Sequence, residues 1–162
     1  MLATGVLNIR QAARAIDRTI VMMIAAALAL GSALQATGGA GFLAGLLLSA
    51  VGDASPAVIL SAFFLLVAVL ANIISTKATA VLFTPIAVGL ANGLALPIEP
   101  FAVAVVFAAN CSFASPVGYQ TNLLVMAPAN YRFIDFVRVG SPLLIIVWLT
   151  FSLVAPWYYG LI

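Results

Sequence analysis

Long apolar runs separated by short polar connections make up most of this sequence. The runs 20–37 and 139–162 are each close to the roughly 20 residues that a helix needs to cross a hydrocarbon core about 30 Å thick. Six basic and four acidic residues occur among 162, a charged fraction of 6%, whereas a soluble domain carries about 25%. Because so few charges cannot cover a water-facing surface, the sequence predicts an all-α membrane protein built of transmembrane helices.

The composition excludes several kinds of chemistry. The sequence has no histidine, and Cys111 is its only cysteine, so imidazole relays, intrachain disulfides and Cys-type zinc or iron–sulfur sites are absent. No carboxylate pair or nucleophile–base arrangement stands out, so we expect neither an enzyme nor a cofactor. The cations lie beside predicted spans rather than in one basic patch, which argues against a nucleic acid partner.

Arginines orient the chain in the membrane. Arg10, Arg14 and Arg18 form one stripe of a juxtamembrane segment that precedes the first apolar run. Cytoplasmic flanks of membrane spans are rich in Lys and Arg, so we expect the N-terminus on the cytoplasmic side of the plasma (inner) membrane. Arg132 and Arg138, before the last span, belong on the same side. A cleaved signal peptide is the weaker alternative, because further membrane segments follow.

Apolar and polar runs divide the chain into a short N-terminal segment and a transmembrane domain. The expected bounds are 1–19 for the cytoplasmic juxtamembrane segment and 20–162 for the transmembrane domain, with 20–37 a span, 38–52 an interfacial helix, 57–98 a hairpin, 101–127 a broken span and 139–162 the final span. Charge placement leaves open whether the hairpin re-enters the membrane or crosses it fully.

Two polar clusters interrupt the apolar sequence, at 75–79 in the hairpin tip and at 110–122 in the broken span. Pro116 removes a backbone donor and Gly118 loosens the chain, so carbonyls and amides are freed there. Irregular backbone in a bilayer is tolerated where it is buried in protein or lines a cavity, and half-helix ends at such a break suit an anion beside a cation. The alternative is a proline kink whose backbone groups are satisfied by neighbouring Ser and Thr side chains.

Three segments resemble the signatures of a known transporter family. They are NIISTKATA at 72–80, SFASPVGYQTN at 112–122 and YRFIDFVRVGSPL at 131–143. Over nearly its whole length the chain resembles the divalent-anion:sodium symporter family, which includes citrate, dicarboxylate and sulfate transporters. The resemblance implies part of an inverted-repeat transporter fold, in which 57–98 is a re-entrant helical hairpin, 101–127 a broken helix and 139–162 the last helix.

The resemblance also implies functional roles, because in this family the hairpin tip and the broken helix bind sodium and one end of the anion. The corresponding candidates here are Ser75, Thr76, Lys77, Thr79, Ser112, Ser115, Pro116, Gly118, Thr121 and Asn122. Sodium, as a coupling ion, is expected at Ser75, Thr79, Gly118 and Asn122. The expected partners are the lipid bilayer, a small anion, a missing N-terminal half or partner chain, and a second copy in a homodimer.

Lys77 departs from the family pattern, in which the tip reads Ser-Asn-Thr or Ser-Asn-Asn before Ala. Burying an ammonium at bilayer depth costs about 2.5 to 3.5 kcal/mol on insertion scales, so Lys77 needs a partner or a watery cavity. We expect the ammonium to occupy or repel the sodium position and to help hold the anion, which would make transport less sodium-dependent. The alternative is a wet turn in which Lys77 is only a positive-inside charge.

The preferred interpretation is the C-terminal part of a secondary active transporter for small divalent or inorganic anions, coupled to a cation. Sulfate and di- or tricarboxylates are the expected substrate class. Two alternatives stay open: a membrane sensor or assembly subunit that does not transport, and a proton-coupled antiporter or arsenite-type permease. Because 162 residues amount to about one inverted repeat, we expect the chain alone not to transport.

Overall fold

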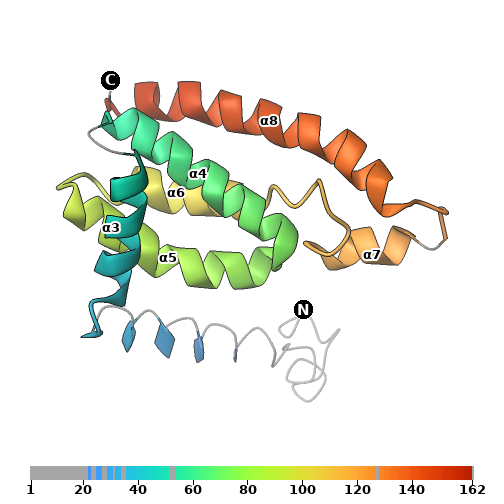
Figure 1. Ribbon diagram of the computed structural model, residues 1–162, viewed down its shortest axis with the longest axis horizontal. Coiled ribbons are helices and arrows are strands. Elements are labelled where there is room, and N and C mark those ends of the chain that lie inside the picture. The colour runs from blue at the N-terminus through green and yellow to red at the C-terminus, as the bar shows by residue number, and fades with distance from the viewer. Residues whose placement is uncertain are drawn as a thin grey trace, which may run out of the picture.

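The computed structural model describes residues 22, 25–26, 29–30, 32–33, 36–51, 54–126 and 128–161. In this part the chain forms helices and connecting turns without a β-strand, which confirms the predicted all-α class (Figure 1). The predicted segment 1–19, which contains Arg10, Arg14 and Arg18, and much of the predicted span 20–37 lie outside the described residues.

Successive helices in the described part alternate with short connections. They are α3 (Gly39–Val51), α4 (Pro56–Ile73), α5 (Thr76–Gly93), α6 (Glu99–Ala109), α7 (Gln120–Met126) and α8 (Phe133–Tyr158). The arms of the hairpin are α4 and α5, and the non-helical residues 110–119 separate α6 from α7. The last helix begins at Phe133, ahead of the expected final span 139–162, and the Arg132 N–H caps its first turn by donating to Asp135 Oδ2 at 2.8 Å.

A tight turn joins the two arms of the hairpin. Pro56 begins α4 at a position where its missing N–H costs nothing, and α4 ends at Ile73, after which the Ile74 N–H still donates to Leu70 O. Ser75 is extended and its Oγ accepts from the Ala78 N–H at 3.2 Å, which makes it the N-cap of α5. The polar tip therefore consists of the end of one 18-residue helix and the start of another.

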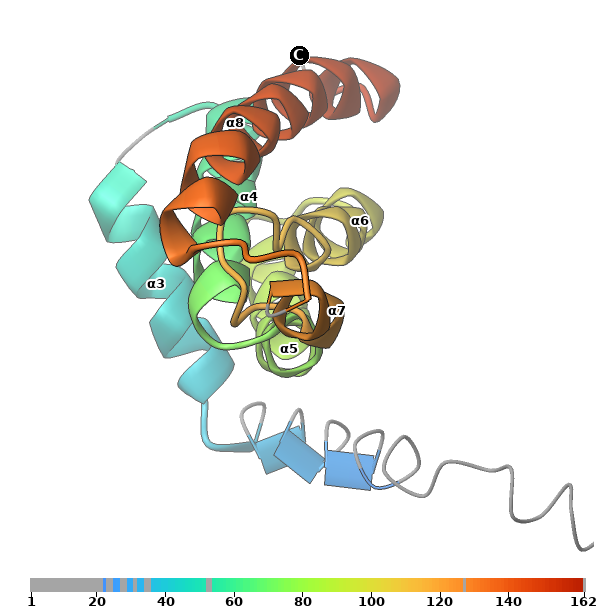
Figure 2. The ribbon, with the colours of Figure 1, turned by 90° about the vertical axis from the view of Figure 1, so that its right-hand side faces the viewer.

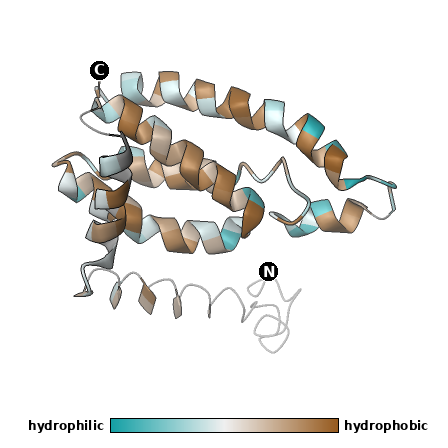
Figure 3. Cartoon of the chain, viewed as in Figure 1, coloured by the Kyte–Doolittle hydropathy of each residue, from teal (hydrophilic) through white to brown (hydrophobic). Residues whose placement is uncertain are grey.

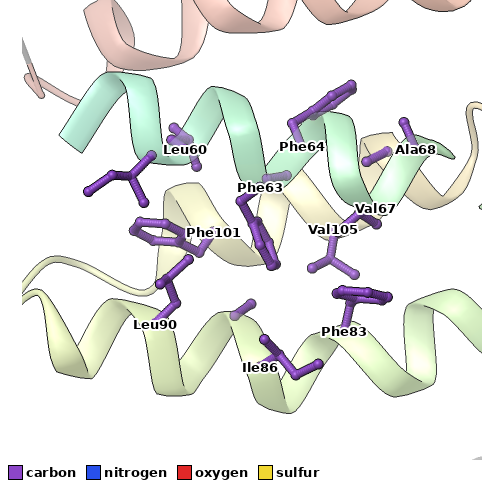
Figure 4. Close-up of a cluster of buried hydrophobic side chains, with 14 of the residues drawn as sticks. Leu60, Phe63, Phe64, Val67, Ala68, Phe83, Ile86, Leu90, Phe101 and Val105 are labelled. Atoms are coloured by element: carbon purple, nitrogen blue, oxygen red, sulfur yellow. The ribbon is translucent and has the colours of Figure 1, made fainter. Parts of the chain in front are cut away.

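Aromatic packing joins the hairpin to α6. The ring of Phe63, from α4, lies edge-on to Phe83 of α5 at 6.2 Å and to Phe101 of α6 at 6.1 Å between centroids (Figure 4). Phe63 and Phe101 have no exposed surface, and Leu60 and Leu90 are equally buried beside them. The three helices thus share one core, so the hairpin and α6 form a single packed unit.

The last helix packs along α4 and away from α5 (Figure 2). Phe64 of α4 stacks on Phe151 of α8 at 4.4 Å between ring centroids. Ser61 Oγ lies 2.7 Å from Ser152 Oγ, and the Trp148 indole N–H donates to the Ser61 carbonyl at 3.1 Å. Polar side chains on the two helices therefore satisfy one another inside an otherwise apolar interface.

Two helices in the described part, α4 and α8, are long and apolar enough to cross a membrane, judged by length and composition. Apolar residues run along α4, as Figure 3 shows, and its outward side chains Leu66 and Val69 are exposed. Ile146 and Leu153 are likewise exposed on α8. Apolar surface of this extent is expected on helices that face lipid.

We predict that Phe63→Ala strongly destabilises the helical unit. The substitution leaves a cavity where three helices meet, and such losses cost about 3 to 5 kcal/mol in well-packed cores. The measurement is the unfolding free energy in detergent. Leu153→Ala is the matched control, because Leu153 is 73% exposed, and should change the unfolding free energy by less than about 0.5 kcal/mol. Equal effects of the two substitutions would contradict the core assignment.

Candidate functional site

The non-helical residues 110–119 lie against the tip of the hairpin (Figure 1). The first turn of a helix has backbone N–H groups with no partner in the helix itself. At the start of α5, the Thr76 N–H donates to Gly118 O at 3.0 Å, and Thr76 Oγ1 lies 2.8 Å from Ser112 Oγ. A carbonyl freed by the break thus pairs with an amide freed by the helix start.

Asn72, in the last turn of α4, binds the same irregular segment with both ends of its amide. Its Nδ2 donates to Cys111 O at 2.9 Å and to Ala68 O at 2.8 Å, and its Oδ1 accepts from the Ala114 N–H at 2.8 Å. Asn72 was not among the predicted site residues. The available signal was a lone amide near the end of an otherwise apolar helix, where it is costly unless it has partners.

Asn122 stabilises the break from its other end. This residue lies in the first turns of α7, and its Nδ2 donates to Ser112 O at 2.9 Å and to Ser115 O at 3.2 Å. Ser115 Oγ in turn accepts from the Val117 N–H at 3.1 Å. The break is therefore an ordered loop, in which side-chain amides and hydroxyls replace the missing helical hydrogen bonds.

Two glycines allow the break to lie close to its neighbours. A Cβ on Gly118 would lie 2.6 Å from Ala71 O and 2.9 Å from Ser112 Cβ, so only glycine fits between the break and the hairpin tip. On the opposite side, a Cβ on Gly140 of α8 would overlap the carbonyl of Phe113. The break is thus held between the hairpin tip and α8.

The structure brings most of the predicted site residues together. Hydrogen bonds link Thr76, Ser112, Ser115, Gly118 and Asn122 directly or through one another, with Ser75 adjacent and Pro116 buried in the same loop. Thr121 lies on the exposed side of α7, away from these contacts.

Thr79 and Lys77 lie on opposite faces of α5. Thr79 is fully buried on the side that packs into the core, and its Oγ1 has no hydrogen-bond partner among the described residues. Lys77 is exposed, and the structure gives its ammonium no carboxylate partner within the described part of the chain. The start of α5 carries partial positive charge and the end of α4 carries partial negative charge, so it is the full charge of Lys77 that makes the tip of the hairpin electropositive.

Acidic groups lie elsewhere in the described residues. Glu99 begins α6, beyond the far end of α5, and Asp135 lies in the first turn of α8. A cavity of about 320 Å³ between the break and the start of α8 is lined by Asn122, Tyr131 and Asp135. Because that cavity carries a carboxylate and the hairpin tip carries an ammonium, the tip is the better place for an anion.

We predict that Gly118→Ala loosens the contact between the hairpin tip and the break. The added methyl group cannot fit beside Ala71 O, so the hydrogen bond from Thr76 N–H to Gly118 O must lengthen, at a cost of about 1 to 3 kcal/mol. Hydrogen exchange should become at least tenfold faster in the peptides that contain 71–79 and 110–120. Gly93→Ala is the control, because nothing lies within 4 Å of its Cβ, and unchanged exchange in both variants would contradict the packing described.

Comparisons with known proteins agree with the motifs. The family model for citrate transporters matches residues 1–161. An uncharacterised transporter of Synechocystis sp. is 39% identical over 160 residues, which cover 99% of this chain and 26% of that protein. A Chlamydomonas reinhardtii protein named probable sodium/sulfate cotransporter 3 is 35% identical over 145 residues, or 88% of this chain and 16% of that protein. No solved structure gives a significant match.

The chain thus spans about a quarter or less of these relatives. The matches confirm the resemblance to divalent-anion:sodium symporters, and these relatives are named as transporters. Together with the apolar helices α4 and α8, they identify an integral membrane protein. By the match along nearly its whole length, the chain belongs to the citrate transporter family.

Proposed function

We propose that this chain forms the substrate-binding part of a secondary transporter for small divalent anions. Sulfate and di- or tricarboxylates are the proposed substrate class. The observation that carries the proposal is the contact of the hairpin tip with the helix break, through the bonds from Thr76 to Gly118 and Ser112. Two relatives named sodium/sulfate cotransporters, 1 and 2, also support an anion as substrate.

The anion binds at the electropositive tip. The start of α5 offers partial positive charge, and Lys77 adds a full charge on the same turn, so a dianion is attracted and partly neutralised there. The Thr76 and Ser112 hydroxyls lie at the same contact and can turn toward an oxyanion. Lys77 therefore takes over part of the charge balance that a bound cation would provide.

A monovalent cation, sodium in the first instance, is the coupling ion and moves with the anion. Hard cations of this kind prefer oxygen ligands, which the break and the tip supply as backbone carbonyls and hydroxyls. Ser75, Thr79, Gly118 and Asn122 are the candidate ligands. The buried Thr79 Oγ1 lacks a hydrogen-bond partner among the described residues, so coordination of an ion would satisfy this hydroxyl.

The hairpin re-enters the membrane in this proposal, with its tip beside the break rather than at the opposite surface. The hairpin, α6 and α8 share packed interfaces, so they move together past a scaffold supplied by a missing half or a partner chain. The protein works in the plasma (inner) membrane as a homodimer, with its N-terminus in the cytoplasm.

Radiolabelled uptake tests the proposal. Membrane vesicles from cells that express the complete natural reading frame should accumulate sulfate or citrate several-fold above vesicles from cells with an empty vector. Uptake of neither anion, from a protein shown to be present in the membrane, would contradict transport of this substrate class.

Asn122→Ala should reduce uptake at least tenfold. The substitution removes the donor to two carbonyls of the break, and each buried group left without a partner costs about 1 to 3 kcal/mol. The control is Asn110→Ala, because Asn110 caps the end of α6 and its amide donates back to Val106 O, so it does not hold the break to another element. Equal uptake by the two variants would show that the Asn122 bonds do not shape the site.

Lys77→Asn should make uptake more dependent on sodium. Without the ammonium, a bound cation must balance more of the anion's charge, so the ratio of uptake in sodium to uptake in choline should rise at least fivefold. Arg138→Gln removes an exposed cation at the start of α8 and should leave the ratio unchanged. An unchanged ratio in Lys77→Asn would contradict the proposed role of Lys77.

A further inference from the structure

The outer surface of α5 differs from that of the other long helices. On α4 the exposed residues include Val58, Leu66 and Val69, and α8 exposes large apolar side chains along its length. Within α5 no large apolar side chain is exposed. By composition, too, α5 is less apolar than α4, and in Figure 3 it carries pale and teal segments between brown ones.

The exposed positions of α5 carry polar or small residues instead. They are Lys77, Ala78, Thr84, Asn92 and Gly93. At about 100° per residue, Lys77 and Thr84 lie within roughly 20° of one another around the helix, and Asn92 within about 60° of Lys77. The core residues Phe83, Ile86 and Leu90 occupy the opposite side. We call the line from Lys77 past Thr84 to Asn92 the polar side of α5; the partly buried Val81 and Val88 lie on the same arc.

Lipid hydrocarbon cannot satisfy the polar groups on this side of α5. The Asn92 amide has no hydrogen-bond partner among the described residues, and the exposed Lys77 ammonium has no carboxylate beside it there. Thr84 Oγ1 donates to Ala80 O at 2.7 Å, which leaves its lone pairs free to accept. Polar groups at membrane depth face a water-filled cavity or the interior of a bundle, because lipid cannot satisfy them. All three residues stay exposed although α3 packs against α5.

The polar side of α5 leads from the hairpin tip toward the far end of the helix. Thr84 lies about 10 Å from Lys77 along the axis, and Asn92 about 12 Å further, at 1.5 Å rise per residue. The positive charge stands at the tip, where the proposed site lies. A water-filled passage with low-dielectric walls focuses such a charge and concentrates anions within it.

We infer that the polar side of α5 lines the aqueous path by which a small divalent anion reaches the hairpin tip, an inference that rests on the proposed function. Thr84 and Asn92 contact the anion's hydration shell along the way, and Lys77 supplies the field that draws the anion inward.

Cysteine accessibility tests the inference without requiring transport. Thr84→Cys and Asn92→Cys are each introduced into the protein of the complete natural reading frame, which is reconstituted in lipid vesicles and exposed to an anionic sulfonatoethyl or a cationic trimethylammonioethyl methanethiosulfonate. Intact mass reports the labelling, and the unmodified chain gives the background of the buried Cys111. Each labelling rate is divided by the rate at which the same reagent reacts with a small free thiol, which corrects for the different intrinsic reactivity of the two reagents.

Leu66→Cys is the matched control. Leu66 lies seven residues before the end of α4, Thr84 lies eight after the start of α5, and Leu66 is 39% exposed on the apolar side of the hairpin. Ile146→Cys on α8 is a second lipid-facing control. Retention of helical content and elution as a single species show that each variant is folded.

We expect Thr84→Cys and Asn92→Cys to react at least tenfold faster than Leu66→Cys. The anionic reagent should be preferred at Thr84→Cys, and Lys77→Gln should reduce that preference at least threefold. Labelling of both positions as slow as that of Leu66→Cys would overturn the path, since lipid or another helix would then cover α5. Slow labelling in a preparation that takes up anion would overturn the proposed path but leave the proposed transport standing. Fast, Lys77-dependent labelling without uptake supports the path and overturns the proposed transport.

Discussion

The need to pair every backbone amide and carbonyl inside a bilayer governs this structure. Residues 110–119 separate α6 from α7, and lipid hydrocarbon cannot satisfy the backbone groups that are freed there. The hairpin tip meets this need, because Asn72 and Thr76 pair with carbonyls and an amide of the break. Asn122 supplies further donors from α7. The contact is therefore a condition for the break to exist in a membrane.

Close packing follows from this pairing. The backbone hydrogen bond from the Thr76 N–H to Gly118 O, 3.0 Å long, requires that no side chain stand between the break and the hairpin tip, and Gly118 lies against Ala71 there. On the other side, Gly140 lets α8 approach the backbone of Phe113. The aromatic core around Phe63 and the Ser61–Trp148–Ser152 contacts then hold the hairpin, α6 and α8 at fixed positions. An ion site at the tip would thereby be set into a rigid frame, as a site that must bind and release a small anion requires.

Much of the fold was predictable from periodic and compositional signals. Long apolar runs with few charges predict membrane helices, and Ser75 and Pro116 mark the turn and the break. Asn72 was missed because a single amide in an apolar helix gives no indication of what it binds. Lys77 was noticed as an exception to a motif, but its exposure depends on which side of α5 packs into the core. The sequence does not single out the first residue of α8 either, because its cap is a bond from a backbone N–H to a carboxylate.

The sequence by itself determined that the helices are surrounded by lipid and where along the chain they end or break. Hydropathy requires lipid around its helices, and proline, glycine and serine end or interrupt them, because these effects act between residues close in the chain. Only the tertiary structure decided which freed backbone group pairs with which, that Gly118 lies under Ala71, and that α5 turns Thr79 inward and Lys77 outward. Those outcomes depend on contacts between residues some forty positions apart, whose direction is set by how the helices pack.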